Sequence, residues 1–220
     1  MTTTDCPPLS ERITKSLLGY GVIAGPFYVM VAVVQVLIRD GFDPTRHAVS
    51  QLANGHFGWI QIVNFLITGA MVIAGAVGVG RALPPGRLAR WSAFTLGGYG
   101  VGLLAAGVLR ADPSDGFPPG TPPGMGEITW HGMGHFIAAA IGFTCLVAAG
   151  FVTAAAFSRA GSRGWGRLSR VVAVAFAASF VWLSSGTGGA AAILIFTAAV
   201  VASWAWLTAI SVKLYRSGAR

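Results

Sequence analysis

The chain has 220 residues, of which 54% are hydrophobic and only 10% are charged, and its mean hydropathy is +0.68. A soluble domain carries roughly 25% charged residues, so this composition excludes an ordinary water-soluble globular domain. The net charge of +8 does not predict nucleic-acid binding, because the basic residues stand in short clusters between long apolar runs and form no single basic surface.

Apolar runs long enough to cross a bilayer follow one another along the chain. A helix needs about 20 apolar residues to cross the hydrocarbon core. The runs at Leu17–Ile38, Trp59–Val79, Trp91–Leu109 and Ile128–Phe157 meet this length. The first run exceeds the apolar part of a cleaved signal peptide, which is about 7–15 residues, so we expect it to stay in the membrane.

The last apolar run, Val171–Val212, is too long for a single span. It is interrupted at residues 184–189 by the small and polar sequence Ser-Ser-Gly-Thr-Gly-Gly, which is typical of a turn. We therefore expect two helices here, Leu168–Leu183 and Ala190–Val212. The sequence predicts an all-α integral membrane protein, built as a bundle of about six transmembrane helices.

The positions of the basic residues predict the orientation of this bundle, because Lys and Arg are enriched on the cytoplasmic side of membrane proteins. With both termini in the cytoplasm, the chain divides into an N-terminal tail (1–16), a transmembrane domain (17–212) and a basic C-terminal tail (213–220). We expect it in the inner (plasma) membrane. This arrangement places twelve of the fifteen basic residues in the cytoplasm: Arg12, Lys15, Arg81, Arg87, Arg90, Arg159, Arg163, Arg167, Arg170, Lys213, Arg216 and Arg220.

Other polar residues gather on the opposite, extracytoplasmic face, in two loops at residues 39–58 and 110–127. No Asp, Glu, Lys or Arg lies deep within an expected span, so the sequence predicts no proton or ion relay at the membrane midplane. Chemistry is expected at the outer face instead. That face would hold all four histidines and five of the seven acids: His47, His56, His131, His135, Asp40, Asp43, Asp112, Asp115 and Glu127.

Small residues predict how the helices pack. Lipid tails are as apolar as leucine, so transmembrane helices associate through close contacts of small side chains. Gly21 and Gly25 in the first span, and Gly98 and Gly102 in the third, have the four-residue spacing of such contacts.

The sharpest chemical motif is the pair His131 and His135, which share one face of a helix because they are four residues apart. This spacing suits two ligands of one metal ion, although the glutamate of the related zinc motif is absent, since position 132 is Gly. With His47 and Asp112 from the two outer loops, the pair forms a hypothetical zinc site. The alternative is that both histidines bond to loop carbonyls at the membrane surface. Beyond zinc, no cofactor is expected.

A catalytic scheme follows from this hypothesis. Metal-bound water titrates near pH 7 and supplies a hydroxide nucleophile. Ser50 would then hydrogen-bond a developing oxyanion, and Asp115 would carry the proton. The alternative is ordinary loop chemistry, in which Asp112-Pro113 starts a turn and Ser50 caps a short helix.

At these residues the chain resembles the prokaryotic membrane proteins grouped as domain of unknown function 998, over about residues 16–212. This resemblance implies a polytopic helical bundle and no established activity. A looser likeness is to the alkaline-ceramidase/adiponectin-receptor superfamily of membrane metal hydrolases. This likeness implies that their Ser, Asp and His roles would be filled here by Ser50, Asp112, His47, His131 and His135. The first resemblance rests on several segments and on the span-four histidine, His131 or His135. The segments are His47-Ala48-Val49-Ser50-Gln51-Leu52, Gly58-Trp59-Ile60, Asn64-Phe65, Gly69, Arg110-Ala111-Asp112-Pro113 and Gly116-Phe117-Pro118.

The residues leave three functions open. We favour a polytopic membrane protein with a polar outer-face pocket that binds a lipid-like or amphiphilic small molecule. A zinc-dependent intramembrane hydrolase using the His/Asp/Ser cluster is the second function, so whether the chain is an enzyme stays open. A haem-binding electron carrier is the third, with His47 supplying one axial ligand and a span-four histidine the other. Membrane lipids are the expected partners, and nucleic acid is not.

Overall fold

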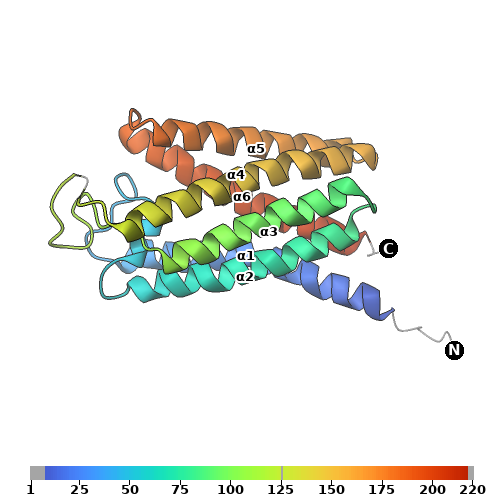
Figure 1. Ribbon diagram of the computed structural model, residues 1–220, viewed down its shortest axis with the longest axis horizontal. Helices are drawn as coiled ribbons and strands as arrows, with labels where there is room; N and C mark the ends of the chain where they lie inside the picture. The colour runs from blue at the N-terminus through green and yellow to red at the C-terminus, as the bar shows by residue number, and fades with distance from the viewer. Residues whose placement is uncertain (1–7, 125, 218–220) are drawn as a thin grey trace.

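The computed structural model describes residues 8–124 and 126–217, which form six long α-helices and one short 3₁₀ helix (Figure 1). All six α-helices are long and apolar enough to cross a membrane, which confirms the predicted all-α bundle of six spans. The elements in chain order are α1 (Leu9–Ile38), η1 (Val49–Ala53), α2 (Gly58–Ala82), α3 (Arg87–Val108), α4 (Trp130–Arg159), α5 (Arg163–Ser184) and α6 (Gly189–Arg216).

The helix boundaries lie close to the expected spans, with one main difference. Helix α1 begins at Leu9, eight residues ahead of the expected span, so the second half of the predicted N-terminal tail continues the helix. Residues 1–7 of that tail lie outside the described residues. The predicted turn between the last two spans is present, and Gly186 (φ +69°) and Gly189 (φ +50°) adopt the left-handed backbone that glycine tolerates best.

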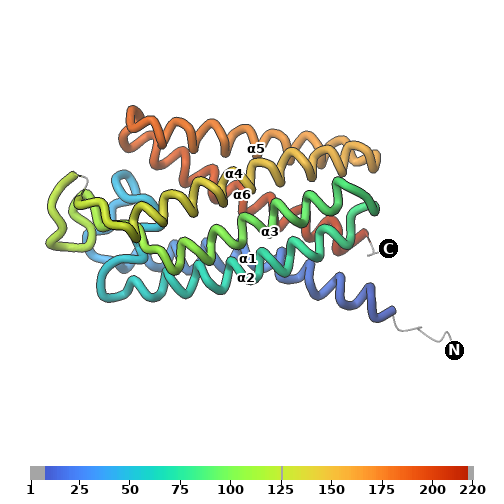
Figure 2. Tube along the Cα trace, viewed as in Figure 1, coloured from blue at the N-terminus to red at the C-terminus, as the bar shows by residue number. Residues whose placement is uncertain are grey.

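The six helices form a closed ring. Each packs against the helices before and after it in the chain, and α6 returns to pack against α1. Figure 2 shows the resulting bundle, with the start of α1 and the end of α6 at the same end. We call this the basic end, because Arg81, Arg87, Arg159 and Arg163 lie there, in the helix ends that flank the α2–α3 and α4–α5 connections. The opposite end, which carries residues 39–57, 109–124 and 126–129 and the turn between α5 and α6, is the loop end (Figure 1).

Glycines bring neighbouring helices into close contact, as their spacing predicts. A Cβ atom added at Gly102 would lie 2.8 Å from the Cα of Gly142, so α3 and α4 meet backbone to backbone. Added at Gly25, it would lie 2.9 Å from the backbone oxygen of Trp204 on α6, and at Gly98, 2.8 Å from the Sγ of Cys145. These contacts hold the ring together through the dispersion forces that replace hydrophobic burial inside lipid.

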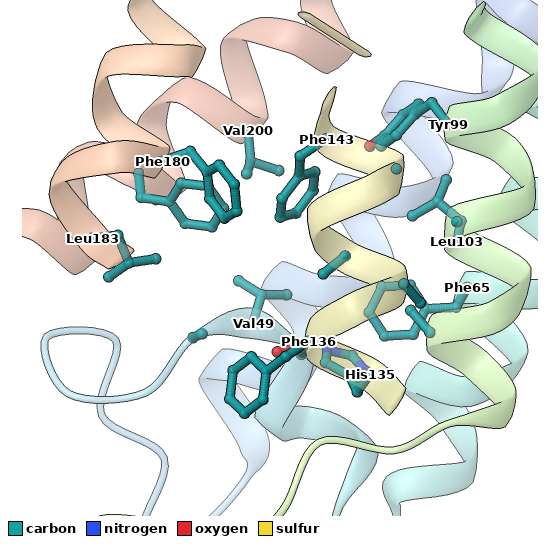
Figure 3. A pocket seen from close by; sticks show the side chains of 18 of the residues that line it. Val49, Phe65, Tyr99, Leu103, His135, Phe136, Phe143, Phe180, Leu183 and Val200 are labelled. Atoms are coloured by element: carbon teal, nitrogen blue, oxygen red, sulfur yellow. The ribbon is translucent and has the colours of Figure 1, made fainter. Parts of the chain in front are cut away.

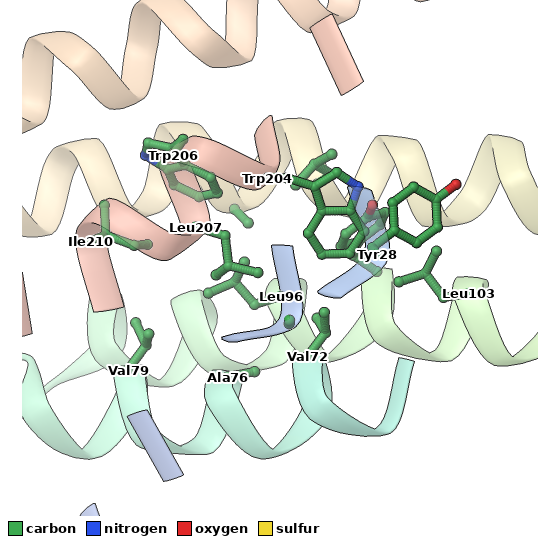
Figure 4. Close-up of a cluster of buried hydrophobic side chains, with 14 of the residues drawn as sticks. Tyr28, Val72, Ala76, Val79, Leu96, Leu103, Trp204, Trp206, Leu207 and Ile210 are labelled. Carbon is green, nitrogen blue, oxygen red and sulfur yellow. The ribbon is translucent and has the colours of Figure 1, made fainter. Parts of the chain in front are cut away.

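The centre of the ring toward the basic end is filled by large side chains of α6. Trp204, Leu207 and Ile210 are buried there, and Figure 4 shows them facing Val72 of α2 and Leu96 of α3. These side chains pack tightly across this part of the ring. A cavity lies toward the loop end.

Candidate functional site

A cavity of about 160 Å³ lies inside the ring near the loop end (Figure 3). All six helices and η1 contribute to its wall, so it is a property of the whole bundle. Three phenylalanines line it where α4, α5 and α6 approach one another. The ring centroid of Phe143 lies 5.1 Å from that of Phe180 and 5.5 Å from that of Phe196, in edge-to-face geometry that aromatic side chains favour.

Tyrosines from two further helices form the aromatic floor of this cavity. Tyr28 on α1 and Tyr99 on α3 both line it, and both pack against Trp204 of α6. The ring centroids lie 4.9 Å apart for Tyr28 and Trp204, and 5.6 Å apart for Tyr99 and Trp204. Rigid aromatic walls give a cavity a defined shape, which favours a particular ligand over general lipid filling.

Polar groups reach the cavity at only a few points. His135 lines it from α4 and is 5% exposed, while Ser50 lines it from η1 and Thr197 from α6. Among the described residues, none that line the cavity is Asp, Glu, Lys or Arg. The wall of this cavity is mainly apolar, unlike the polar pocket expected from sequence, and several ionisable residues at this end bond to the loops instead.

His47 shows how the loops take up these polar groups. It is 3% exposed, and its Nδ1 accepts a hydrogen bond from the backbone N–H of Asp43 at 2.9 Å. Its Nε2 donates to the backbone oxygen of Asp115 at 3.1 Å, and its ring packs between Phe42 and Phe117. Both ring nitrogens are therefore used within the protein, which leaves no lone pair for a metal in this arrangement.

Asp112 forms hydrogen bonds at the start of α4. Its carboxylate accepts hydrogen bonds from the backbone N–H (2.8 Å) and the hydroxyl (2.6 Å) of Thr129, and the Thr129 hydroxyl in turn accepts from the N–H of Gly132 (3.2 Å). This chain of bonds caps the helix. Nearby, the Nδ1 of His131 is buried and has no hydrogen-bond partner among the described residues, and its ring stacks on Trp130 with centroids 3.5 Å apart.

The predicted metal ligands, His47, Asp112, His131 and His135, thus each contact a different set of neighbouring groups. Within residues 8–124 and 126–217, no group of three or more His, Cys, Asp or Glu side chains is placed to hold a metal ion. The zinc site and the hydrolase built on it stay predictions, and so does the haem carrier. Elemental analysis of the purified protein tests zinc, with about one equivalent expected if the site forms, and a Soret band tests haem.

The two predicted catalytic residues lie at the same end of the bundle with separate contacts. Ser50 belongs to η1 and lines the cavity. Asp115 has a left-handed backbone (φ +53°), and its Oδ1 accepts from the N–H of Gly124 at 3.2 Å, which shapes the second loop. No hydrogen bond joins the two side chains in the described part of the chain. Their catalytic roles stay predictions.

The two loops interlock into one structure, here called the loop cap (residues 39–57, 109–124 and 126–129). The guanidinium of Arg39 donates to the backbone oxygens of Leu52 (3.1 Å) and Asn54 (2.6 Å) and lies over the ring of Phe117. Burial lowers the pKa of Arg39 below its usual value. Gln51 donates to the backbone oxygen of Asp112 at 2.9 Å. The two loops are therefore bonded to each other, and Ala48, Val49 and Ser50 of the loop cap line the cavity.

Beside the cavity lies a buried amide ladder that the sequence analysis did not single out. Gln35 donates to the Oε1 of Gln61 (2.8 Å), Asn64 donates to the same oxygen (3.2 Å) and to the backbone oxygen of Tyr28 (3.2 Å), and Thr68 donates to Asn64 (3.2 Å). The sequence carried a signal for this ladder, because the polar residues at positions 61, 64 and 68 share one face of a helix. These side chains are uncharged, so the rarity of charge inside a span does not mark them.

The fold and the cavity together define a polytopic helical membrane protein whose ring of six spans encloses an apolar cavity under a bonded loop cap. The chain matches, over residues 22–213, the sequence model of the family described as "Protein of unknown function (DUF998)". It therefore belongs to this family, which confirms the first resemblance. No curated protein and no solved structure matches the chain. The looser likeness to membrane metal hydrolases stays a prediction.

Proposed function

We propose that the protein binds a lipid-like or amphiphilic small molecule in the cavity inside its helical ring. The observation that carries this proposal is the cavity wall, which is aromatic and uncharged and which receives residues from all six helices. An apolar ligand body gains free energy from close contact with such a wall, and a few polar groups at one end fix its orientation. The membrane itself supplies molecules of this kind.

Filling the cavity tests the proposal. Ala139 lines the cavity from α4, whereas Ala140, the next residue, is exposed on the outside of the helix. Ala139→Phe places a phenyl ring where the ligand would lie, and Ala140→Phe places the same ring toward lipid. We expect Ala139→Phe to reduce the amount of amphiphile that co-purifies by about tenfold, which corresponds to about 1.4 kcal/mol of binding free energy.

The measurement is organic extraction of the purified protein followed by mass spectrometry, with the extracted amphiphile expressed per mole of protein. The unmodified chain and Ala140→Phe should retain equal amounts. Equal retention by Ala139→Phe, or no bound amphiphile in any of the three proteins, would contradict the proposal.

We also propose that the loop end faces the extracytoplasmic side of the inner membrane. This rests on the arginines in the helix ends that flank the α2–α3 and α4–α5 connections, which lie at the basic end together with the last turn of α6. The test uses a chain without its two native cysteines, Cys6 and Cys145. In intact cells, an impermeant maleimide should label Glu127→Cys in the loop cap and should leave Ser217→Cys, after α6, unlabelled. The reverse pattern would invert the orientation.

A further inference from the structure

The cavity has a chemically distinct end, at the loop cap. Figure 3 shows His135 beside Phe136 and Val49 at this end, with Phe143, Phe180 and Val200 grouped at the other. A bound amphiphile therefore meets its polar partners at His135 and its apolar partners deeper in the bundle. The nature of those polar partners determines which head group the site accepts.

The hydrogen-bonding state of His135 is fixed by Leu109, the residue that follows α3. Its Nδ1 lies 2.7 Å from the backbone oxygen of Leu109, and a carbonyl oxygen can only accept, so Nδ1 carries the hydrogen. The side chain is 5% exposed, and burial of an unpaired charge is costly, which favours the neutral ring. The remaining nitrogen, Nε2, is then a hydrogen-bond acceptor. In the described residues it has no protein donor.

The remaining polar lining matches this acceptor. Ser50 lines the same cavity from η1, and within the described part of the chain its hydroxyl makes no hydrogen bond, so it is free to donate or accept. The wall offers no Lys or Arg for a carboxylate or a phosphate, and no Asp or Glu for an ammonium group. A charged head group buried here would lose its hydration without compensation.

We infer that the ligand is an uncharged amphiphile whose polar end is a hydroxyl group, which donates a hydrogen bond to Nε2 of His135 and meets the hydroxyl of Ser50. This rests on the proposed function and specifies its ligand class: a long-chain or polycyclic alcohol with its hydrocarbon among the phenylalanines of α4, α5 and α6. A hydroxyl both donates and accepts, and so satisfies both His135 and Ser50. The other polar groups of the lining, Tyr28, Tyr99 and Thr197, lie on α1, α3 and α6.

The test uses three photoreactive probes with the same sixteen-carbon, diazirine-bearing chain and different ends: an alcohol, a carboxylate and a quaternary ammonium. The full chain is placed in lipid nanodiscs, illuminated with each probe and digested. Mass spectrometry then quantifies the label on peptides of α4, α5 and α6 that line the cavity. We expect the alcohol to label these peptides at least about fivefold more than either charged probe, the effect of about one hydrogen bond and an uncompensated charge.

Two variants assign the selectivity to residues. His135→Asn keeps an N–H donor for the Leu109 oxygen and removes the Nε2 acceptor, so the preference for the alcohol should fall about fivefold. Thr144→Val removes a hydroxyl from the exposed side of α4, outside the cavity lining, and should keep the preference. Ser50→Ala, which leaves His135 intact, should lower the preference by a smaller factor.

The outcomes separate this inference from the proposed function. Equal labelling of the cavity by all three probes would overturn the hydroxyl assignment and leave the proposed function standing. Labelling by none of them inside the cavity would overturn both. An unchanged alcohol preference in His135→Asn would overturn the role of His135.

Discussion

Replacing Gly132 by alanine is expected to destabilise the protein by about 2 kcal/mol, although glycine to alanine usually stabilises a helix. A Cβ atom at this position would overlap the carboxylate of Asp112. That carboxylate would have to leave its two hydrogen bonds to Thr129, and the cap of α4 would be lost with them. The change is measured as a lower midpoint of thermal unfolding in detergent.

A double-mutant cycle isolates the cause of this effect. In a chain that carries Asp112→Ala, no carboxylate occupies the space beside Gly132, so adding Gly132→Ala should cost little. The two substitutions should therefore be strongly non-additive, as expected for residues in contact. Gly97→Ala on α3 serves as a control, since a Cβ atom there meets nothing within 4 Å and should be neutral or stabilising. Additive effects of the first pair would contradict this account.

Gly25→Ala is expected to separate α1 from α6 and to cost about 2 kcal/mol through overpacking. The added Cβ atom would lie 2.9 Å from the backbone oxygen of Trp204, which cannot rotate away as a side chain would. Because Trp204 packs against Tyr28 and Tyr99, its displacement should also disturb the floor of the cavity. We therefore expect weaker retention of the co-purified amphiphile together with the lower stability.

The matched control lies on the same helix. A Cβ atom at Gly19 meets no other atom within 4 Å, so Gly19→Ala should leave both stability and amphiphile retention unchanged or slightly raised. Thermal unfolding and extraction followed by mass spectrometry measure the two effects. Equal behaviour of Gly25→Ala and Gly19→Ala would show that the contact between α1 and α6 is not close in the membrane.

The fold was predictable because the bilayer imposes a length on every span. Hydropathy alone locates the ends of most helices within a few residues, as at Ile38, where both the expected span and α1 end. The break before α6 was predictable from its glycines, which favour a turn. The close contacts at Gly25 and Gly102 followed from the spacing of small residues. Each of these signals is local in sequence.

The site was less predictable, because it depends on how each helix is rotated about its axis. In lipid, both the outside and the inside of the bundle are apolar, so the sequence carries no strong stripe to mark the inner face. The sequence brought His47, Asp112 and His135 to one end of the bundle. It did not show that His47 bonds to Asp43 and Asp115, or that His135 alone of these three lines the cavity.

The closed ring has a practical consequence. Helix α6 starts at the loop end and ends at the basic end, and its 28 residues span about 40 Å. A tether attached to its last residue is therefore about 40 Å away from the loop end. The protein can therefore be immobilised on a biosensor through the end of α6 while the cavity stays free. Alcohols can then be titrated against it through the surrounding nanodisc, on a scale of mole fraction in the lipid.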